Sequence, residues 1–255
     1  KWLAARCGDE LVNHFTYVIS GDGCLMEGVS QEAISLAGHL ELNKLIVLWA
    51  DNEITIDGKT DLSTSEDQRQ RFEAAGWHVQ AVDGHDQEAI LTAVELAQAE
   101  TGKPSMIACR TTIGYGSPTV AGTSKAHGAP LGAEGLQAFK DNIGWAHEPF
   151  AVPNETMDAW RAAGARGKDT AAAWKGRLSA SPQAEQFNSL QAGILTDAAR
   201  EALTALKELA IKEQPALATR ACSGKVLEAL IPTMPSMLGG SADLTGSNNT
   251  KTSHH

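Results

Sequence analysis

Short apolar runs of strand type alternate with helical segments through the first half of the chain. The runs occupy 15–20, 44–51, 77–82 and 104–111, and they are rich in the β-branched and aromatic residues of buried strands. Segments of helical periodicity separate them, at about 27–40, 65–76 and 86–102. Strands that alternate with helices predict an α/β fold, a doubly wound parallel sheet with right-handed crossovers.

Local signals predict where two of these helices begin and end. Ser65 and Asp86 are the expected N-caps, because short polar side chains accept hydrogen bonds from the free N–H groups of a first helical turn. Gly76 and Gly102 are the expected stops, since glycine readily takes the left-handed conformation after a helix.

Composition and charge limit the partners of the chain. Its 255 residues carry a formal net charge of −10, which argues against nucleic acid and anionic membrane surfaces. No apolar run reaches membrane-spanning length, and no signal-peptide pattern is present. The cysteines lack metal-ligand spacing and indicate reduced thiols, so we expect a cytoplasmic protein. They are Cys7, Cys24, Cys109 and Cys222.

The sequence predicts three regions along the chain. Residues 1–145 form an α/β domain, 146–196 a helical linker with few strand signals, and 197–255 the start of a second α/β domain. Helices are expected at 196–213 and 217–230, followed by a strand at 237–244. The chain opens in a helix-like stretch and stops just after this strand, so we expect a fragment of a larger protein.

Polar residues follow the first two predicted strands. Asp22 lies between Gly21 and Gly23, and Asn52 follows thirty positions later. If the two strands are neighbours, both side chains meet at the carboxyl edge of the sheet, where ligands bind. With a nearby carbonyl they form a hard-oxygen set for Mg²⁺ or Ca²⁺, and the glycines let the backbone approach a phosphate. The helix that begins near Glu27 points its amino end at this edge. Each motif taken alone is also compatible with an ordinary turn.

The pair of motifs resembles the thiamine diphosphate signature, and further motifs resemble one family that uses this cofactor. In chain order they are "GDGCLMEGVSQEA", "DNEITIDG", "RFEAAGWHV", "DGHD", "IGYGSP", "AHGAPLG" and "LGGSADLTGSN". The same order occurs in transketolases. The resemblance covers nearly the whole chain and is weakest in the predicted linker.

This resemblance implies roles for residues of the first domain. Asp22, Asn52 and the carbonyl of Ile54 correspond to the ligands of a divalent cation, Mg²⁺ with Ca²⁺ or Mn²⁺ as alternatives. Gly23 corresponds to a backbone donor to the diphosphate of the cofactor. His127, in "AHGAPLG", corresponds to the catalytic histidine between that diphosphate and the reacting end of the sugar donor, although a histidine beside a glycine can also cap a loop.

In the second domain, Arg220 and Ser247 resemble the residues that hold the sugar phosphate, and Asp243 resembles the acid that contacts a substrate hydroxyl. Glu27 has two compatible interpretations, as a helix cap or as part of a carboxylate network at a dimer interface. His85, in "DGHD", either belongs to the cap formed with Asp86 or lies near the site.

The implied function is transfer of a two-carbon ketol unit from a ketose phosphate to an aldose phosphate, in the pentose phosphate pathway, by a homodimer with active sites at the subunit interface. The family takes a catalytic glutamate from the pyrimidine-binding domain of the other subunit. That motif does not occur in this sequence, so we expect this chain alone to be incomplete for turnover.

Two alternatives stay open. One is another thiamine diphosphate enzyme: dihydroxyacetone synthase, 1-deoxyxylulose-phosphate synthase or the dehydrogenase subunit that acts on a 2-oxo acid. "CLMEG" and "LGGSADL" favour transketolase over the last two. The other alternative is a non-catalytic module that only binds the cofactor. The reading frame beyond both ends of the chain would discriminate between an enzyme and a module.

Overall fold

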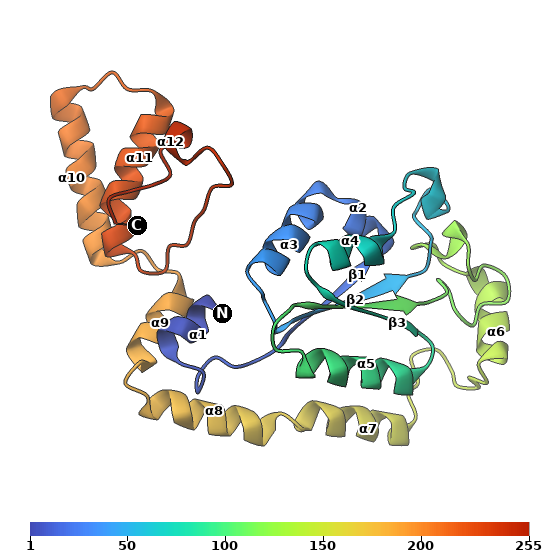
Figure 1. Ribbon diagram of the computed structural model, residues 1–255. Coiled ribbons are helices and arrows are strands. Elements are labelled where there is room, and N and C mark those ends of the chain that lie inside the picture. The colour runs from blue at the N-terminus through green and yellow to red at the C-terminus, as the bar shows by residue number, and fades with distance from the viewer. Residues whose placement is uncertain (255) are drawn as a thin grey trace. The chain divides into compact units, whose positions relative to one another are not determined.

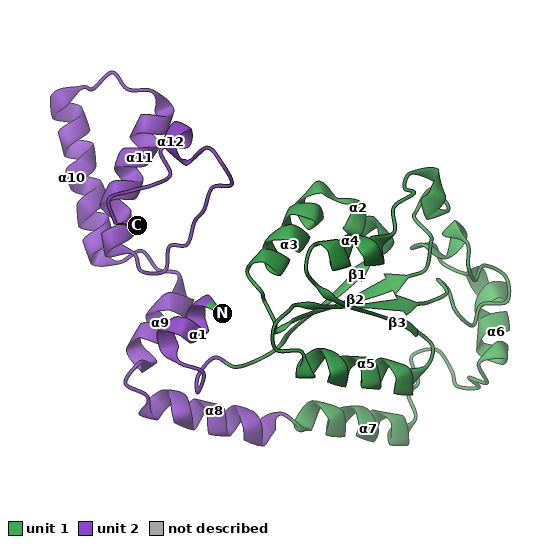
Figure 2. Cartoon of the chain, viewed as in Figure 1, with its two compact units in different colours: residues 1, 13–166 green, residues 2–12, 167–255 purple. Residues whose placement is uncertain are grey.

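The computed structural model describes residues 1–254, and the chain divides into two compact units. Unit 1 contains residue 1 and residues 13–166, and unit 2 contains residues 2–12 and the chain from 167 onward (Figure 2). The boundaries predicted from the sequence, at 145 and 196, stay predictions. No helix within residues 1–254 combines the length and the apolar character needed to cross a bilayer.

Unit 1 contains a four-stranded parallel sheet. Its strands are β1 (Thr16–Gly21), β2 (Leu45–Asp51), β3 (His78–Asp83) and β4 (Ser105–Arg110), in the order β1-β2-β4-β3 (Figure 1). Each lies within one residue of a strand predicted from the sequence. The predicted parallel α/β sheet is therefore confirmed.

Helices cover both faces of this sheet. α2 (Asp22–Met26) and α3 (Gly28–His39) connect β1 to β2, and α4 (Gln68–Ala74) connects β2 to β3. α5 (Gln87–Ala99) connects β3 to β4 and lies on the opposite face from α3 and α4 (Figure 1). Helices on both faces make the sheet doubly wound, as predicted.

Alternate residues of the central strands supply two separate cores. In β2, Val47 and Trp49 pack in the cluster that includes α3 and α4, whereas Ile46 and Leu48 pack in the cluster that includes α5. Successive side chains of a strand point to opposite faces, so a strand buried on both faces is apolar at every position. This explains why the two central strands, β2 and β4, appear in the sequence as nearly continuous apolar runs.

The helix boundaries correct two predictions. The N-cap of α4 is Asp67, not Ser65, and the Asp67 carboxylate accepts hydrogen bonds from the N–H groups of Arg69 and Gln70. A carboxylate adjacent to the first helical residue is a strong acceptor there, and Ser65 lies two residues too early. α5 ends at Ala99, before Gly102, because Glu100 already has an extended backbone.

The other two boundary predictions are confirmed. Asp86 is the N-cap of α5, and its side chain accepts a hydrogen bond from the N–H of Ala89 at 3.1 Å. Gly76 follows α4 with a φ of 87°, a conformation that favours glycine.

Loss of the Asp86 cap is expected to destabilise unit 1 by about 1 kcal/mol, because Asp86→Ala leaves an N–H of the first turn without its acceptor. Asp86→Asn keeps an oxygen at the same position and is the matched control. Urea unfolding of both variants measures the effect. An equal loss in the asparagine variant would show that charge, not capping, stabilises this end of the helix.

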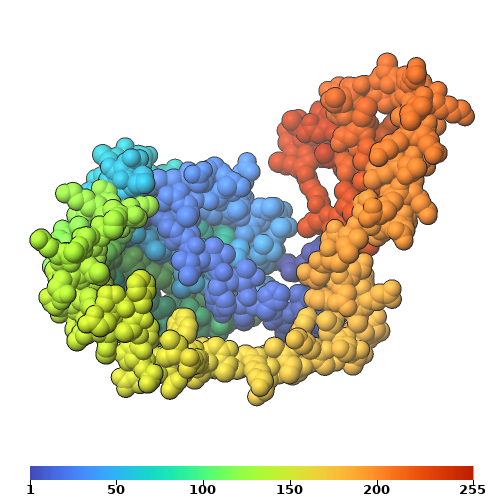
Figure 3. Space-filling view, turned by 180° about the vertical axis from the view of Figure 1, so that it is seen from behind, coloured from blue at the N-terminus to red at the C-terminus, as the bar shows by residue number. Residues whose placement is uncertain are grey.

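Further helices follow in both units. Unit 1 also contains α6 (Gly132–Asn142), α7 (Asn154–Ala165) and the short 3₁₀ turns η1 (Thr60–Leu62) and η2 (Ser124–Ala126). The loop around η1 protrudes at the surface of unit 1, where Ile56 and Leu62 are exposed (cyan, Figure 3). Unit 2 contains α1 (Trp2–Cys7), α8 (Lys168–Ala180), α9 (Ala184–Ala192), α10 (Asp197–Glu213), α11 (Thr219–Leu230), η3 (Ile231–Thr233) and α12 (Thr245–Asn248).

The predicted strand at 237–244 is wrong. This segment has no regular secondary structure and ends at α12. A strand is stable only beside another strand, and the described part of unit 2 contains none. Gly239 and Gly240 also weaken the local preference for an extended ladder.

Candidate functional site

The strand register brings the carboxyl ends of all four strands to one edge of the sheet. Gly21 pairs with Ala50, and Asp51 pairs with Arg110. Arg110 in turn pairs with the last residue of β3. The residues that follow β1 and β2 therefore leave the sheet at the same level, as the sequence predicted for neighbouring parallel strands.

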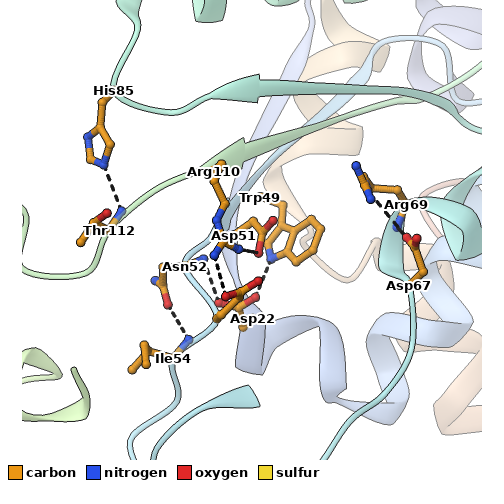
Figure 4. Close-up of polar contacts among 11 residues, drawn as sticks. Asp22, Trp49, Asp51, Asn52, Ile54, Asp67, Arg69, His85, Arg110 and Thr112 are labelled. Carbon is orange, nitrogen blue, oxygen red and sulfur yellow. Dashed lines mark hydrogen bonds and ion pairs between the residues drawn. The ribbon is translucent and has the colours of Figure 1, made fainter. Parts of the chain in front are cut away.

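Asp22 and Asn52 both lie at this edge, as predicted for neighbouring strands, and the Asp22 side chain contacts the backbone of Asn52. Their joint role as side-chain ligands of one cation stays a prediction. Asp22 opens α2 and is only 7% exposed. Its Oδ2 accepts a hydrogen bond from the backbone N–H of Asn52 at 3.2 Å, and its Oδ1 accepts one from the indole N–H of Trp49 at 3.2 Å (Figure 4). Both oxygens are thus held in place by β2 and by the residue directly after it.

The Asp22 carboxylate forms no ion pair with any described residue, although Arg110 lies close enough for its positive charge to act on it. Burial raises its pKa, and the hydrogen bonds from Asn52 and Trp49, together with the positive charge of Arg110, offset part of this rise. Within residues 1–254, no lysine, arginine or histidine forms an ion pair with it. A buried carboxylate without an ion pair is costly, and a bound metal cation would supply a direct partner of opposite charge.

The residues after β2 offer two further oxygens. The side-chain Oδ1 of Asn52 accepts a hydrogen bond from the N–H of Ile54 at 2.9 Å. The carbonyl oxygen of Ile54 accepts no hydrogen bond from any described residue. Carboxylate, amide and carbonyl oxygens suit Mg²⁺ or Ca²⁺. Within the described chain, no group of three or more His, Cys, Asp and Glu side chains could hold a metal ion, so a cation here would need these neutral oxygens in addition to the Asp22 carboxylate.

Arg110 lies beside this set and was not predicted from the sequence. Its guanidinium forms ion pairs with Asp51 at 3.1 Å and with Glu53 at 2.6 Å. The hydrogen bond from Arg110 lowers the pKa of Glu53, whereas burial raises that of Asp51. The only sequence signal for Arg110 is its place at the end of β4. The two pairs become evident only when the register sets β4 beside β2.

His85 lies at this edge, and Asp86 alone supplies the side-chain cap of α5. The place of His85 near a functional site stays a prediction. Nε2 of His85 accepts a hydrogen bond from the N–H of Thr112 at 3.0 Å (Figure 4). The His85 ring also stacks on Tyr115, with ring centroids 3.9 Å apart. A pocket of about 680 Å³ is lined by His85, Asn52 and Arg110 among others. A second, of about 580 Å³, is lined by Asp22 and Trp49 among others.

The glycines of the first motif leave space at this edge. A Cβ atom added to Gly21 or Gly23 would meet no protein atom within 4 Å. The N–H of Gly23 lies in the first turn of α2, where backbone donors have no intrahelical acceptor. Glu27 occupies the N-cap position of α3, but its exposed side chain makes no capping hydrogen bond. Its side-chain role stays a prediction.

His127 follows η2 in unit 1, and its side chain is exposed. It makes no side-chain hydrogen bond with any described residue. Gly114 has a φ of 65° and lies close to the segment before His127. A Cβ atom added to Gly114 would stand 2.8 Å from the Cβ atom of Ala126. The two motifs "IGYGSP" and "AHGAPLG" therefore pack together, and the catalytic role of His127 stays a prediction.

The three predicted sugar-binding residues lie in unit 2 and are exposed. Arg220 is in the first turn of α11, Ser247 is in α12, and Asp243 shortly precedes α12. α11 and α12 pack against each other, since a Cβ added to Gly224 of α11 would lie 2.9 Å from that of Asn249. Their roles in sugar binding stay predictions.

The raised pKa of Asp22 predicts a pH-dependent stability in the absence of a cation. Because burial favours the neutral form, protonated Asp22 stabilises the fold relative to the unfolded chain. This stabilisation is complete below the ordinary aspartate pKa of 3.8 and is lost as the pH rises through the higher pKa of Asp22 in the folded state. Asp22→Asn does not titrate, so its stability relative to the wild type is expected to increase from about pH 4 to about pH 7. Thermal unfolding with a chelator at both pH values measures this. A constant or opposite difference would contradict the assigned burial effect.

Comparison with known proteins agrees with this fold. The family model described as "Transketolase, thiamine diphosphate binding domain" matches residues 3–198. The transketolase of Cereibacter sphaeroides is 52% identical over 247 residues, which are 97% of this chain and 37% of that protein. The crystal structure of transketolase from Campylobacter jejuni has a TM-score of 0.83 at 35% identity, over 97% of this chain and 38% of that one.

A transketolase structure from Pichia stipitis, in complex with sedoheptulose 7-phosphate, has a TM-score of 0.79 at 40% identity and covers 94% of this chain and 36% of that one. The present chain thus spans little more than a third of the length of these relatives. The matched model includes the whole parallel sheet and the edge at which Asp22 and Asn52 meet. The chain belongs to the transketolase family.

Proposed function

We propose that the full-length protein transfers a two-carbon ketol unit from a ketose phosphate to an aldose phosphate, with thiamine diphosphate and a divalent cation. The observation that carries this proposal is the buried Asp22 carboxylate, which contacts the backbone of Asn52 at the carboxyl edge of the sheet and forms no ion pair within the described chain. Membership in the transketolase family supports it, since the matched model is described as the part that binds thiamine diphosphate.

The residues of unit 1 would hold the cation and the diphosphate. Asp22, Asn52 and the carbonyl of Ile54 supply oxygens to Mg²⁺, with Ca²⁺ or Mn²⁺ as alternatives, and the N–H of Gly23 donates to a diphosphate oxygen. Thiamine diphosphate supplies a centre that stabilises a carbanion, which side chains alone cannot provide. His127 would bind near the reacting end of the donor sugar.

The residues of unit 2 would bind the sugar itself. Arg220 offers a planar fork of donors to a phosphate, and Ser247 adds a short hydroxyl contact. Asp243 would accept a hydrogen bond from a sugar hydroxyl. The Pichia stipitis relative is described in complex with a phosphorylated seven-carbon ketose, which is a sugar of the proposed class.

An assay of the full-length protein tests this function. A five-carbon ketose phosphate as donor and a five-carbon aldose phosphate as acceptor are expected to give products two carbons longer and two carbons shorter. Omission of either thiamine diphosphate or Mg²⁺ should abolish both products. Turnover only with formaldehyde as acceptor would identify a dihydroxyacetone synthase, and cofactor binding without any turnover would identify a binding module.

We propose in addition that the full-length protein is a cytoplasmic homodimer of the pentose phosphate pathway, with each site shared between subunits and Glu27 at their interface. Sedimentation of the cofactor-saturated protein at micromolar concentration is expected to show a dimer, because the glutamate expected from the partner is needed for turnover. An active monomer would contradict this assignment.

A further inference from the structure

Glu53, between the two neutral oxygens of the candidate cation site, has an unusual backbone conformation. Its φ is 59°, in the left-handed region that side-chain-bearing residues rarely adopt. The residue before it supplies the Asn52 side chain, and the residue after it supplies the Ile54 carbonyl. This conformation accompanies the hydrogen bond from the Ile54 N–H to Asn52 Oδ1 at 2.9 Å. Strained residues of this kind persist only where the surroundings hold them.

Arg110 holds the carboxylates on both sides of Asn52. Nη1 of its guanidinium lies 3.1 Å from Oδ1 of Asp51, and Nη2 lies 2.6 Å from Oε2 of Glu53 (Figure 4). The carbonyl of Glu53 also accepts a hydrogen bond from the N–H of Thr60 at 3.0 Å. Two nitrogens of one rigid planar group thus fix the distance between the end of β2 and the side chain of the strained residue.

The backbone of Arg110 is anchored between two strands. The N–H of Thr111 donates to the carbonyl of Asp51 at 3.0 Å, and the N–H of Gly84 donates to the carbonyl of Arg110 at 2.8 Å. Gly84 leaves no room for a side chain here, because an added Cβ would stand 2.9 Å from the oxygen of Arg110. The guanidinium therefore extends from a fixed point of the sheet.

We propose that Arg110 is a positioning residue, which holds Glu53 in its left-handed conformation and thereby keeps Asn52 and Ile54 arranged for one cation. The inference rests on the proposed function, because the cation is that of thiamine diphosphate binding. The charge of Arg110 by itself would repel a cation. Its favourable effect on cation binding comes from the two guanidinium nitrogens, which contact the Asp51 and Glu53 carboxylates together.

Two substitutions and their combination test this role in the full-length protein. Arg110→Lys keeps the charge but replaces the fork by a single ammonium group. Glu53→Gly removes the need for a restraint, because glycine adopts positive φ without steric cost. Arg110→Lys is expected to weaken Mg²⁺-dependent binding of thiamine diphosphate about tenfold, which corresponds to about 1.4 kcal/mol. In the Glu53→Gly background, the same substitution is expected to weaken binding less than about twofold. Isothermal titration measures both.

A second measurement requires no cofactor. Hydrogen–deuterium exchange of the peptide that contains Ile54 is expected to accelerate in Arg110→Lys, because the hydrogen bond to Asn52 Oδ1 opens more often. The acceleration should disappear in the Glu53→Gly background. Arg161→Lys, at an exposed ion pair with Asp158 in α7, is the matched control and should change neither measurement.

Each outcome supports or overturns the inference. If the wild type binds the cofactor, two results overturn the role of Arg110. One is an equal loss of affinity from Arg110→Lys in the wild-type and Glu53→Gly backgrounds, and the other is no loss in either background. Failure of the wild type to bind thiamine diphosphate overturns the proposed function and this inference together. Unchanged exchange at Ile54 in Arg110→Lys overturns the restraint on Glu53 whatever the binding result.

Discussion

Asp22→Ala is expected to abolish Mg²⁺-dependent binding of thiamine diphosphate, with a loss of affinity of about a hundredfold or more. Residues that only support metal ligands already change metal affinity by about 10–100-fold, and Asp22 supplies the one carboxylate of the candidate set. The remaining Asn52 and Ile54 oxygens are neutral and cannot replace the lost charge. Isothermal titration of thiamine diphosphate in the presence of Mg²⁺ measures the loss.

Two comparisons make this result specific. Asn52→Ala should act in the same direction but less strongly, because a neutral ligand is lost. Asp61→Ala, at an exposed carboxylate of η1 that lines neither pocket at this edge, removes the same charge from unit 1 and should leave the affinity unchanged. Unchanged cofactor affinity in a folded Asp22→Ala protein would refute the assigned role of Asp22.

Arg220→Ala is expected to raise KM for phosphorylated sugar donors by about tenfold to a hundredfold in the full-length protein. A charged hydrogen bond to a phosphate typically contributes about 1.5–3 kcal/mol, and about 1.4 kcal/mol corresponds to one factor of ten. Arg220 is exposed on α11, so its removal should leave the fold of unit 2 intact. Steady-state kinetics with a ketose phosphate donor measure the change.

The choice of donor separates phosphate binding from a structural role. Hydroxypyruvate has no phosphate, so its KM should change far less in Arg220→Ala. Lys225→Ala removes another exposed positive charge from α11 and should leave both donors unaffected. An equal loss with both donors would mean that Arg220 supports the fold or the dimer and does not bind the sugar phosphate.

The correctly predicted elements are those set by local physics. The two central strands, β2 and β4, are largely apolar because both of their faces are packed, and this pattern is visible without any tertiary contact. The capping of α5 by Asp86 depends on residues within one turn of each other, so it could be predicted too. The strand at 237–244 failed because local apolar character does not provide a partner for the backbone.

The sequence by itself determined the parallel sheet, and it determined that Asp22 and Asn52 would meet if their strands were neighbours. Only the tertiary structure decided that β1 and β2 are neighbours and that β4, not β3, lies beside β2. That order brings Arg110 to Asp51 and Glu53, 59 and 57 positions away in the chain. It also leaves the Asp22 carboxylate buried beside Trp49. Ion pairs and burial depend on the distance between segments far apart in the sequence, and folding alone sets that distance.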